Sequence, residues 1–386
     1  MTCKDHSNYV DKAKVNQEYP RRWKNLILLA PMPSAGGMAD VFLAKQGAGL
    51  SLSRLVVVKR IRAGFRSEIV WLEMFKNEAQ AMLSLKSPHI VQTFDAQFSD
   101  EEPYLVMEYV EGPSFKELFD QLQKSKSQIP LNMFLELLKQ CAQALQVAHE
   151  FKDPQLGVLS PIIHRDISPQ NMILSVEGYV KLIDFGIAKS NALPGMTQVG
   201  QVKGKLTYMS PEQFEDRPLD GRTDLFSLGI VFWELLTQQR LMSDTATSQE
   251  PTIAKIVKGN LKIKSPQDLT GVPPPIANLV MKLLNLNVEQ RFASARQLIG
   301  EIENLQLTYK LEKNGESVKD FVAMHFSHSI NTKKKFLQQL LQAANFNRET
   351  IGNVDSNQNP EITKLSSPNY APRIQENFES GRCLRR

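Results

Sequence analysis

The sequence predicts an α+β fold of two lobes, an antiparallel sheet that carries one helix followed by a mainly helical lobe. Short runs rich in β-branched and aromatic residues, separated by Gly, Ser, Pro and acidic turns, occupy the first part of the chain. One stretch of helical character, "WLEMFKNEAQAMLSL", lies between them. After "EGPS" the apolar residues recur at helical spacing, which indicates that helices form the second lobe.

The expected strands of the first lobe are "NLILLA", "DVFLAK", "RLVVVKRI", "IVQTFDA" and "PYLVMEYV". In the second lobe "LNMFLELLKQCAQALQVAHE" predicts an amphipathic helix, and "DLFSLGIVFWELL", apolar nearly all round, predicts a buried one. Between them "MILS" and "YVKLI" predict a small hairpin, and further helices are expected near 252–258, 275–285 and 295–304. Two amphipathic stretches, "SVKDFVAMHF" and "KKKFLQQLLQAANF", are expected to pack on the helical lobe, with a partner or membrane surface as the alternative.

Composition limits the class of protein. With 386 residues, 42% hydrophobic and 23% charged, the chain is an ordinary globular one rather than disordered or fibrous. A formal charge of +5, with basic and acidic residues interspersed, gives no reason to expect a nucleic-acid partner. Three scattered cysteines predict neither a disulfide framework nor a metal site. We expect a cytoplasmic protein without a membrane span, because no stretch reaches about 18 apolar residues.

Two motifs carry the chemistry, "HRDISPQN" at 164–171 and "IDFG" at 183–186. Phosphoryl transfer requires a base for the attacking hydroxyl and ligands for Mg²⁺ beside the phosphates. Asp166 is placed to accept the hydroxyl proton, and Asn171 and Asp184 are placed as the Mg²⁺ ligands. Phe185 is interpreted as a packing switch beside Asp184, and His164 as a core imidazole.

A lysine and a pair of glycines complete the predicted phosphate site. Lys59 ends "VVVK" inside an apolar strand, where a lysine is costly unless it is paired, and Glu78 on the following helix is the expected partner. Gly36 and Gly37 allow the backbone to approach a triphosphate, and Val41 would pack on the base ring. These two glycines also fit an ordinary hairpin turn, and that alternative stays open.

The motifs as a set resemble the eukaryotic-like (Hanks-type) serine/threonine protein kinases of bacteria. "GGMADVFLA", "HRDISPQN" and "KGKLTYMSPEQ" are most similar to a branch found in myxobacteria. The resemblance implies a bilobal protein-kinase fold that uses ATP and Mg²⁺. We therefore expect an N-terminal extension (1–23), a kinase domain (24–305) divided into an N-lobe (24–110) and a C-lobe (111–305), a helical tail (306–345) and an unstructured end (346–386).

The resemblance also implies roles for residues outside the two motifs. By this resemblance, Met107 would be the gatekeeper residue. The hinge segment that binds adenine would consist of Glu108, Tyr109 and Val110. Val57 stands where the family usually has Ala. The larger Val side chain would slightly narrow the adenine site on its sheet side, which is called the adenine roof here.

Three further residues take structural roles by the same resemblance. Glu212 would pair with Arg291, and Asp224 would anchor the catalytic loop.

Two positions depart from the family pattern. Ser168 replaces the usual catalytic-loop Lys, and Lys205 after Gly204 replaces the usual Thr. One hypothesis is that Lys205 supplies the γ-phosphate charge that Ser168 cannot. The alternative is a solvated loop lysine at 205 and a slower enzyme.

The preferred interpretation is an active kinase for protein Ser/Thr hydroxyls that phosphorylates itself, at Thr197 or else Ser190, with Arg165 receiving that phosphate. Its partners are protein substrates that the sequence does not identify, together with self-association for autophosphorylation. A pseudokinase that serves as a nucleotide-binding scaffold is the main alternative, and a small-molecule phosphotransferase is a third. The long connection "EFKDPQLGVLSPII" is interpreted as an extra surface loop rather than a docking site.

Overall fold

The computed structural model describes residues 19–32, 39–47, 53–66, 69–98, 102–154, 156–185, 206–242, 250–310 and 317–352. Contacts along the chain divide it into two compact units, Met1–Ala344 and Asn345–Arg386. All the packing described below lies within the first unit. The predicted unstructured end lies almost entirely outside the described residues.

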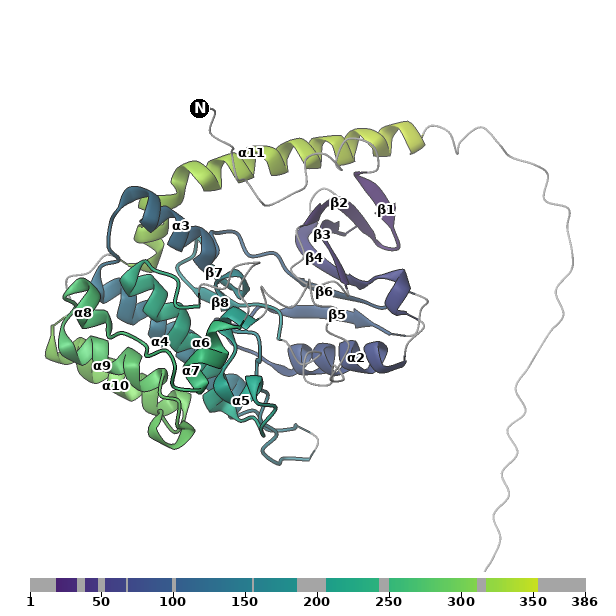
Figure 1. Ribbon diagram of the computed structural model, residues 1–386. Coiled ribbons are helices and arrows are strands. Elements are labelled where there is room, and N and C mark those ends of the chain that lie inside the picture. Colours follow the sequence, from purple (N-terminus) through teal and green to yellow (C-terminus); the bar gives the residue numbers. More distant parts are fainter. Residues whose placement is uncertain are drawn as a thin grey trace, which may run out of the picture. The chain divides into compact units, whose positions relative to one another are not determined.

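A six-stranded sheet forms the N-lobe, with all neighbouring strands antiparallel and in the order β1-β2-β3-β4-β6-β5 (Figure 1). Every predicted strand is present, and the sheet begins earlier than residue 24, because Arg21–Trp23 pairs with the second strand. The strands are β1 (Arg21–Trp23), β2 (Leu26–Met32), β3 (Ala39–Gln46), β4 (Arg54–Ile61), β5 (Thr93–Gln97) and β6 (Tyr104–Glu108).

The two faces of this sheet carry different side chains. In the β3–β4 ladder Val41 lies opposite Lys59 and Leu43 lies opposite Val57, so these four side chains share one face. The other face is an apolar cluster that includes Phe42, which lies between Val41 and Leu43 in the chain. Lys59 therefore projects from the face opposite this cluster.

Helix α2 (Ile69–Ser84) lies along the sheet beside β5 (Figure 1). It buries Met74, Phe75, Ala79 and Met82, which follow helical spacing. Glu78 lies on the same buried face, so the fold brings this carboxylate to the sheet.

Helices make up the C-lobe, as predicted. The buried helix α6 is enclosed on all sides from Thr223 to Thr237, and Gly229 allows it to approach α9 closely, since a Cβ there would lie 2.8 Å from the Cβ of Leu283. The helices are α3 (Phe115–Ser125), α4 (Leu131–His149), α5 (Pro211–Phe214), α6 (Gly221–Thr237), α7 (Thr252–Val257), α8 (Pro266–Thr270), α9 (Pro274–Leu283) and α10 (Ala295–Thr308). Short 3₁₀ turns are η1 (Ala63–Phe65), η2 (Pro169–Asn171), η4 (Leu206–Tyr208) and η5 (Val288–Gln290).

The predicted hairpin is the two-stranded sheet of β7 (Met172–Leu174) and β8 (Val180–Leu182). The chain from β6 reaches it through Gly112, whose φ of 156° and lack of a side chain permit a close approach. A Cβ at Gly112 would lie only 1.8 Å from the carbonyl oxygen of Leu174. Close backbone contact therefore fixes the connection between the lobes on the hairpin.

The C-terminal part differs from the expectation of two separate stretches, because one continuous helix, α11 (Val318–Gly352), contains both. Its first part, residues 318–330, packs on the helical lobe, as expected, whereas residues 336–344 contact the N-lobe sheet instead. Within the described parts of the chain, none of the helices has the length and apolar character to cross a membrane.

Candidate active site

Lys59 lies at the centre of the candidate site. Its Nζ is 2.6 Å from Oε1 of Glu78 and 3.1 Å from Oδ1 of Asp184, so β4, α2 and the segment after β8 converge on one ammonium group. Burial alone would lower the pKa of Lys59, but the Asp184 and Glu78 carboxylates outweigh it and raise the pKa above its ordinary value. Lys59 is therefore charged at neutral pH.

The predicted base and one predicted metal ligand contact each other. Asn171 donates from Nδ2 to the backbone oxygen of Asp166 at 2.9 Å and to its carboxylate Oδ2 at 3.0 Å. The η2 turn holds Asn171 in place, because its backbone N–H donates to the carbonyl oxygen of Ser168 at 3.0 Å. The turn thus fixes the side chain of Asn171 against the carboxylate of Asp166.

Asp224 of α6 anchors the catalytic loop through hydrogen bonds to its backbone. Its carboxylate accepts hydrogen bonds of 2.8 Å from the backbone N–H groups of His164 and Arg165, and Nε2 of His149 lies at 2.8 Å as well. Burial would raise the pKa of Asp224, but these hydrogen bonds hold it below its ordinary value. An ionised Asp224 therefore ties the loop to the buried helix.

The backbone at two site residues adopts the left-handed region, with φ of 64° at Arg165 and 53° at Asp184. Such conformations are unfavourable for residues other than glycine and persist where surrounding contacts impose them. Here the contacts are the Asp224 bond to Arg165 and the Lys59 bond to Asp184.

Phe185 is fully buried, and its ring lies 4.4 Å from the imidazole of His164. His164 is itself fully buried, and its Nε2 lies 3.1 Å from the carbonyl oxygen of Ile183. This places His164 in the core, in agreement with its interpretation as a structural residue. The packing fixes Asp184, between Ile183 and Phe185, with its carboxylate toward Lys59.

The predicted adenine-binding segment follows β6. Met107 and Val110 are buried, and Met107 lies opposite Val57 in the sheet. Glu108 accepts a hydrogen bond of 2.8 Å from Nζ of Lys181 and one of 3.1 Å from the backbone N–H of Gln92. The side chain of Glu108 therefore fixes the segment to β8.

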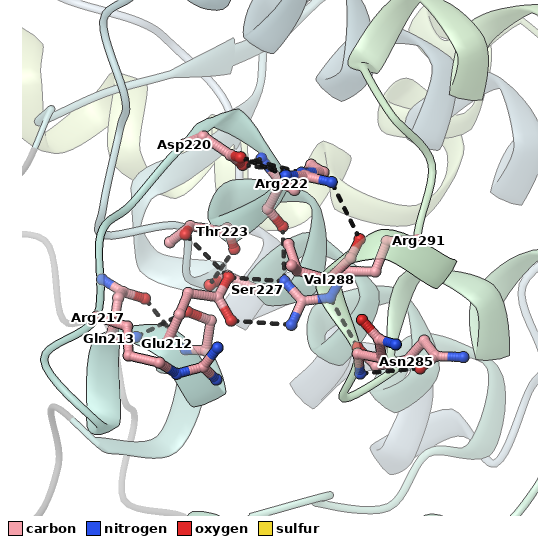
Figure 2. Close-up of polar contacts among 12 residues, drawn as sticks. Glu212, Gln213, Arg217, Asp220, Arg222, Thr223, Ser227, Asn285, Val288 and Arg291 are labelled. Atoms are coloured by element: carbon pink, nitrogen blue, oxygen red, sulfur yellow. Dashed lines mark hydrogen bonds and ion pairs between the residues drawn. The ribbon is translucent and has the colours of Figure 1, made fainter.

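A second buried ion pair, between Arg291 and Glu212, lies in the C-lobe (Figure 2). Arg291 donates to Glu212 through two nitrogens, at 2.7 and 2.9 Å, and Thr223 donates to the same carboxylate at 2.9 Å. Burial would raise the pKa of Glu212, but the Arg291 hydrogen bonds keep it below its ordinary value. The pairing expected of Glu212 and Arg291 is present.

Several predicted residues lie outside the described part of the chain: Gly36, Gly37, Lys205, Ser190 and Thr197. Ser168 is described and partly buried at the start of η2, where its side chain does not cap the turn.

Sequence reasoning missed two residues that support the catalytic loop. Gln213, in "SPEQF", donates from Nε2 to the carbonyl oxygen of Arg165 at 3.1 Å, and His149 contacts Asp224. A polar residue at the end of an apolar helix was the only local signal for His149, and the sequence carried none for the Gln213 contact.

The fold and site together define a two-lobed protein with a charged, paired lysine in its N-lobe sheet and a contacting Asp–Asn pair in the loop before β7. A family model described as "Protein kinase domain" matches residues 35–302. The tyrosine-protein kinase MasK of Myxococcus xanthus is 31% identical over 306 residues, which cover 79% of this chain and 47% of that protein. A probable serine/threonine-protein kinase of Clostridium perfringens is 32% identical over 286 residues, which cover 74% of this chain and 39% of that protein.

Among solved structures, the kinase domain of PknI from Mycobacterium tuberculosis shares the fold, with a TM-score of 0.53 at 19% identity. The match covers 74% of this chain and 98% of that one. The chain belongs to the protein kinase family, and it spans less than half the length of the two curated relatives. Its placement in a myxobacterial branch stays a prediction.

Proposed function

We propose that the chain is an active protein kinase that transfers the γ-phosphate of ATP to Ser or Thr hydroxyls of proteins. The observation that carries this is the contact of Lys59 with both Glu78 and Asp184, found together with the contact of Asn171 with Asp166. Phosphoryl transfer depends mainly on positioning and on charge, and this set of groups supplies both.

Asn171 and Asp184 would hold Mg²⁺. Asn171 uses its amide nitrogen on Asp166, so its carbonyl oxygen is the atom suited to a cation, and the carboxylate of Asp184 is 38% exposed. Mg²⁺ prefers oxygen ligands and usually binds through one or two protein groups plus phosphates and water. The residues fit the ion, which would neutralise charge on the phosphates.

The protein groups divide the remaining work. Lys59 orients the α and β phosphates, and Glu78 keeps the ammonium group in place. The oxygen of the substrate hydroxyl forms a bond to the γ-phosphorus, and Asp166 accepts the proton that this hydroxyl loses. The bond from this phosphorus to the bridging oxygen breaks, and ADP leaves with that oxygen.

The preference for Ser and Thr over Tyr rests on Pro169 in the catalytic loop and on the "SPEQ" ending, both by resemblance. The relatives carry both kinds of name, since MasK is called a tyrosine kinase and the Clostridium protein a serine/threonine kinase. Acid hydrolysis of the ³²P-labelled product tests the preference. Phosphoserine or phosphothreonine is expected, and phosphotyrosine alone would contradict it.

Lys205 is proposed to supply the γ-phosphate charge that Ser168 lacks. Two unit charges about 4 Å apart interact by roughly 4 kcal/mol at an effective dielectric of about 20. Lys205→Ala should therefore lower turnover about 10² to 10³-fold, as for other preorganised groups. Lys203→Ala, two residues away, is the matched control, and a drop below about threefold at Lys205 would contradict the role.

Autophosphorylation is proposed at Thr197, with Arg165 as the receiver of the phosphate. Among the described residues, the buried Nε of Arg165 has no hydrogen-bond partner, and burial lowers the pKa of this guanidinium despite nearby Asp224. An anion would supply the missing acceptor. Mass spectrometry after incubation with Mg-ATP should find phosphate at Thr197 in the wild type and none in Asp166→Ala.

The pseudokinase alternative gains no support from the relatives, which carry kinase names. A small-molecule phosphotransferase is likewise not favoured. Protein substrates remain to be identified, and the cytoplasmic location and self-association are part of this proposal.

A further inference from the structure

Helix α11 contacts both lobes of the kinase (Figure 1). In its first half Val318, Phe321, Val322, Phe326 and Ile330 are buried in the apolar core that runs through the C-lobe. The start of the helix also touches the β7–β8 turn, because a Cβ at Gly178 would lie 3.0 Å from the backbone nitrogen of Lys319. The first half of α11 is thus part of the C-lobe.

The part of the helix from residue 333 to residue 344 is called the strap here. Leu340 and Ala344 of the strap are buried in a separate cluster with Leu29, Ala30 and Leu43 of the N-lobe sheet. Partly buried residues complete this cluster: Phe336, Leu337 and Leu341 from the strap, and Ile27, Met32, Leu55 and Tyr109 from the N-lobe and hinge. A single helix therefore makes apolar contacts with the C-lobe through one part and with the N-lobe through another.

The strap packs on the sheet face that carries Lys59. Leu43 shares that face with Val41, two residues away, and lies opposite Val57, the predicted adenine roof. Two residues along a strand span about 6.6 Å, so the strap contacts the sheet about one side chain beyond the predicted adenine site. Tyr109 of the predicted hinge belongs to the same cluster.

Two ion pairs join the strap to the chain just after the hinge. Nζ of Lys333 is 2.8 Å from Oε1 of Glu117, and Nζ of Lys334 is 3.4 Å from Oε1 of Glu111. A cavity of about 420 Å³ lies between the hinge and the strap, lined by Glu108 and Tyr109 on one side and Lys334 and Leu337 on the other. The strap therefore runs alongside the hinge and contacts residues that come before and after the hinge in the chain.

We propose that the strap holds the two lobes in the arrangement that binds Mg-ATP, so that release of the strap from the N-lobe weakens nucleotide binding and slows phosphoryl transfer. This inference rests on the proposed function. Its direction follows from the contacts, because the strap is docked in the same structure in which Lys59 reaches both Glu78 and Asp184 and Phe185 is buried. A strap that blocked the site would instead be expected to accompany a broken Lys59–Glu78 pair.

The chain offers a matched pair of variants for the test. Ala344 is buried against the N-lobe, whereas Ala343 is exposed on the same helix turn. Ala344→Glu places a carboxylate in the apolar cluster and should release the strap, since an unpaired charge is unfavourable there. Ala343→Glu adds the same charge and volume at the surface. Leu340→Glu and Gln339→Glu form a second pair with the same logic.

The measurements are Mg-ATP affinity by calorimetry, the transfer rate, and hydrogen exchange of the amides in 336–344, all on the full chain. In Ala344→Glu we expect faster exchange in the strap and an ATP dissociation constant raised about fivefold or more, a typical coupling between distant elements. Ala343→Glu should stay within about twofold of wild type, below the usual range of such coupling.

Equal ATP affinity in the two variants, with exchange faster in Ala344→Glu, would overturn the proposal, and so would tighter binding or faster transfer in Ala344→Glu. A wild type that binds Mg-ATP but transfers no phosphate would defeat the proposed function alone. The affinity comparison would still decide the role of the strap.

Discussion

Two buried ion pairs, Lys59–Glu78 and Arg291–Glu212, are alike in chemistry and distance but differ in surroundings. The first is 2.6 Å long, with side chains 15% and 7% exposed, and it includes a third group, Asp184, that is 38% exposed. The second is 2.7 Å long, with side chains 0% and 4% exposed, and its groups are hydrogen-bonded on all sides by residues of the C-lobe.

The difference teaches how the fold separates stability from chemistry. Arg291 connects α5 to the segment before α10, and its side chain is buried away from any ligand. Lys59 has a partner, Asp184, whose side chain is partly exposed, so we expect the Lys59 charge to be available to phosphates. Removing the Arg291–Glu212 pair should affect folding, and removing the Lys59–Glu78 pair should affect activity.

The largest expected effect is on folding. Arg291→Met leaves the Glu212 carboxylate buried without its partner and should lower the free energy of unfolding by about 3 to 5 kcal/mol. Urea denaturation measures this change. Arg296→Met removes an exposed arginine paired with Glu150 and is the control, with an expected loss much smaller than that of Arg291→Met, because water screens an exposed pair. Equal losses in the two variants would break the comparison.

The next effect is on activity. Lys59→Met should lower the transfer rate about 10² to 10³-fold, because it removes a preorganised charge at the phosphates. Lys76→Met, at an exposed lysine on α2, should leave the rate unchanged. Rates from ATP with Mg²⁺ and a generic basic protein test this. A loss of stability in Lys59→Met as large as that in Arg291→Met would contradict the separation of roles.

The pH dependence of stability sharpens the comparison further. Because Arg291 keeps the folded-state pKa of Glu212 below its ordinary value of 4.5, the carboxylate stabilises the fold above that pH, and this contribution is lost as pH falls through the folded pKa. Glu212→Gln should therefore be less stable than wild type at pH 7 by about 1.5 to 3 kcal/mol. The difference should shrink below about pH 4.5, as seen by denaturation at each pH. A constant difference down to pH 3 would contradict the assignment.

The smallest effect belongs to an exposed pair. Lys116 and Asp120 lie one turn apart on α3, 2.6 Å from each other and both open to solvent. Asp120→Asn should change the free energy of unfolding by only about 0.3 to 0.5 kcal/mol, because water screens the pair. Thermal denaturation with and without 1 M NaCl measures it. A change above about 1 kcal/mol would show that burial is not what separates the pairs.

Local signals in the sequence predicted most of the fold. The strands were found from β-branched runs, and α6 from its continuous apolar composition. Helix α3 was missed although its capping box, Ser114 with Glu117, is a sequence signal. The two stretches of α11 were not joined, because "SHSINT" between them is polar. The partners of Lys333 and Lys334, which are Glu117 and Glu111, lie more than 200 residues earlier in the chain.

The candidate site was predictable where a single residue type in its local sequence setting indicates a function. Lys59 in an apolar strand required a partner, and the structure contains the Glu78 pair. The contacts of Gln213 with Arg165 and of His149 with Asp224 depend on how distant elements pack, so no local pattern could reveal which partners these two residues have.

The most direct test of the account is γ-phosphate transfer from Mg-ATP to the protein itself and to a generic basic protein. Wild type, Asp166→Ala and Lys59→Met should be measured together. Transfer by the wild type that is lost in Asp166→Ala and reduced about 10² to 10³-fold in Lys59→Met is the predicted result. No transfer by a wild type that still binds ATP, or equal transfer in all three proteins, would contradict it.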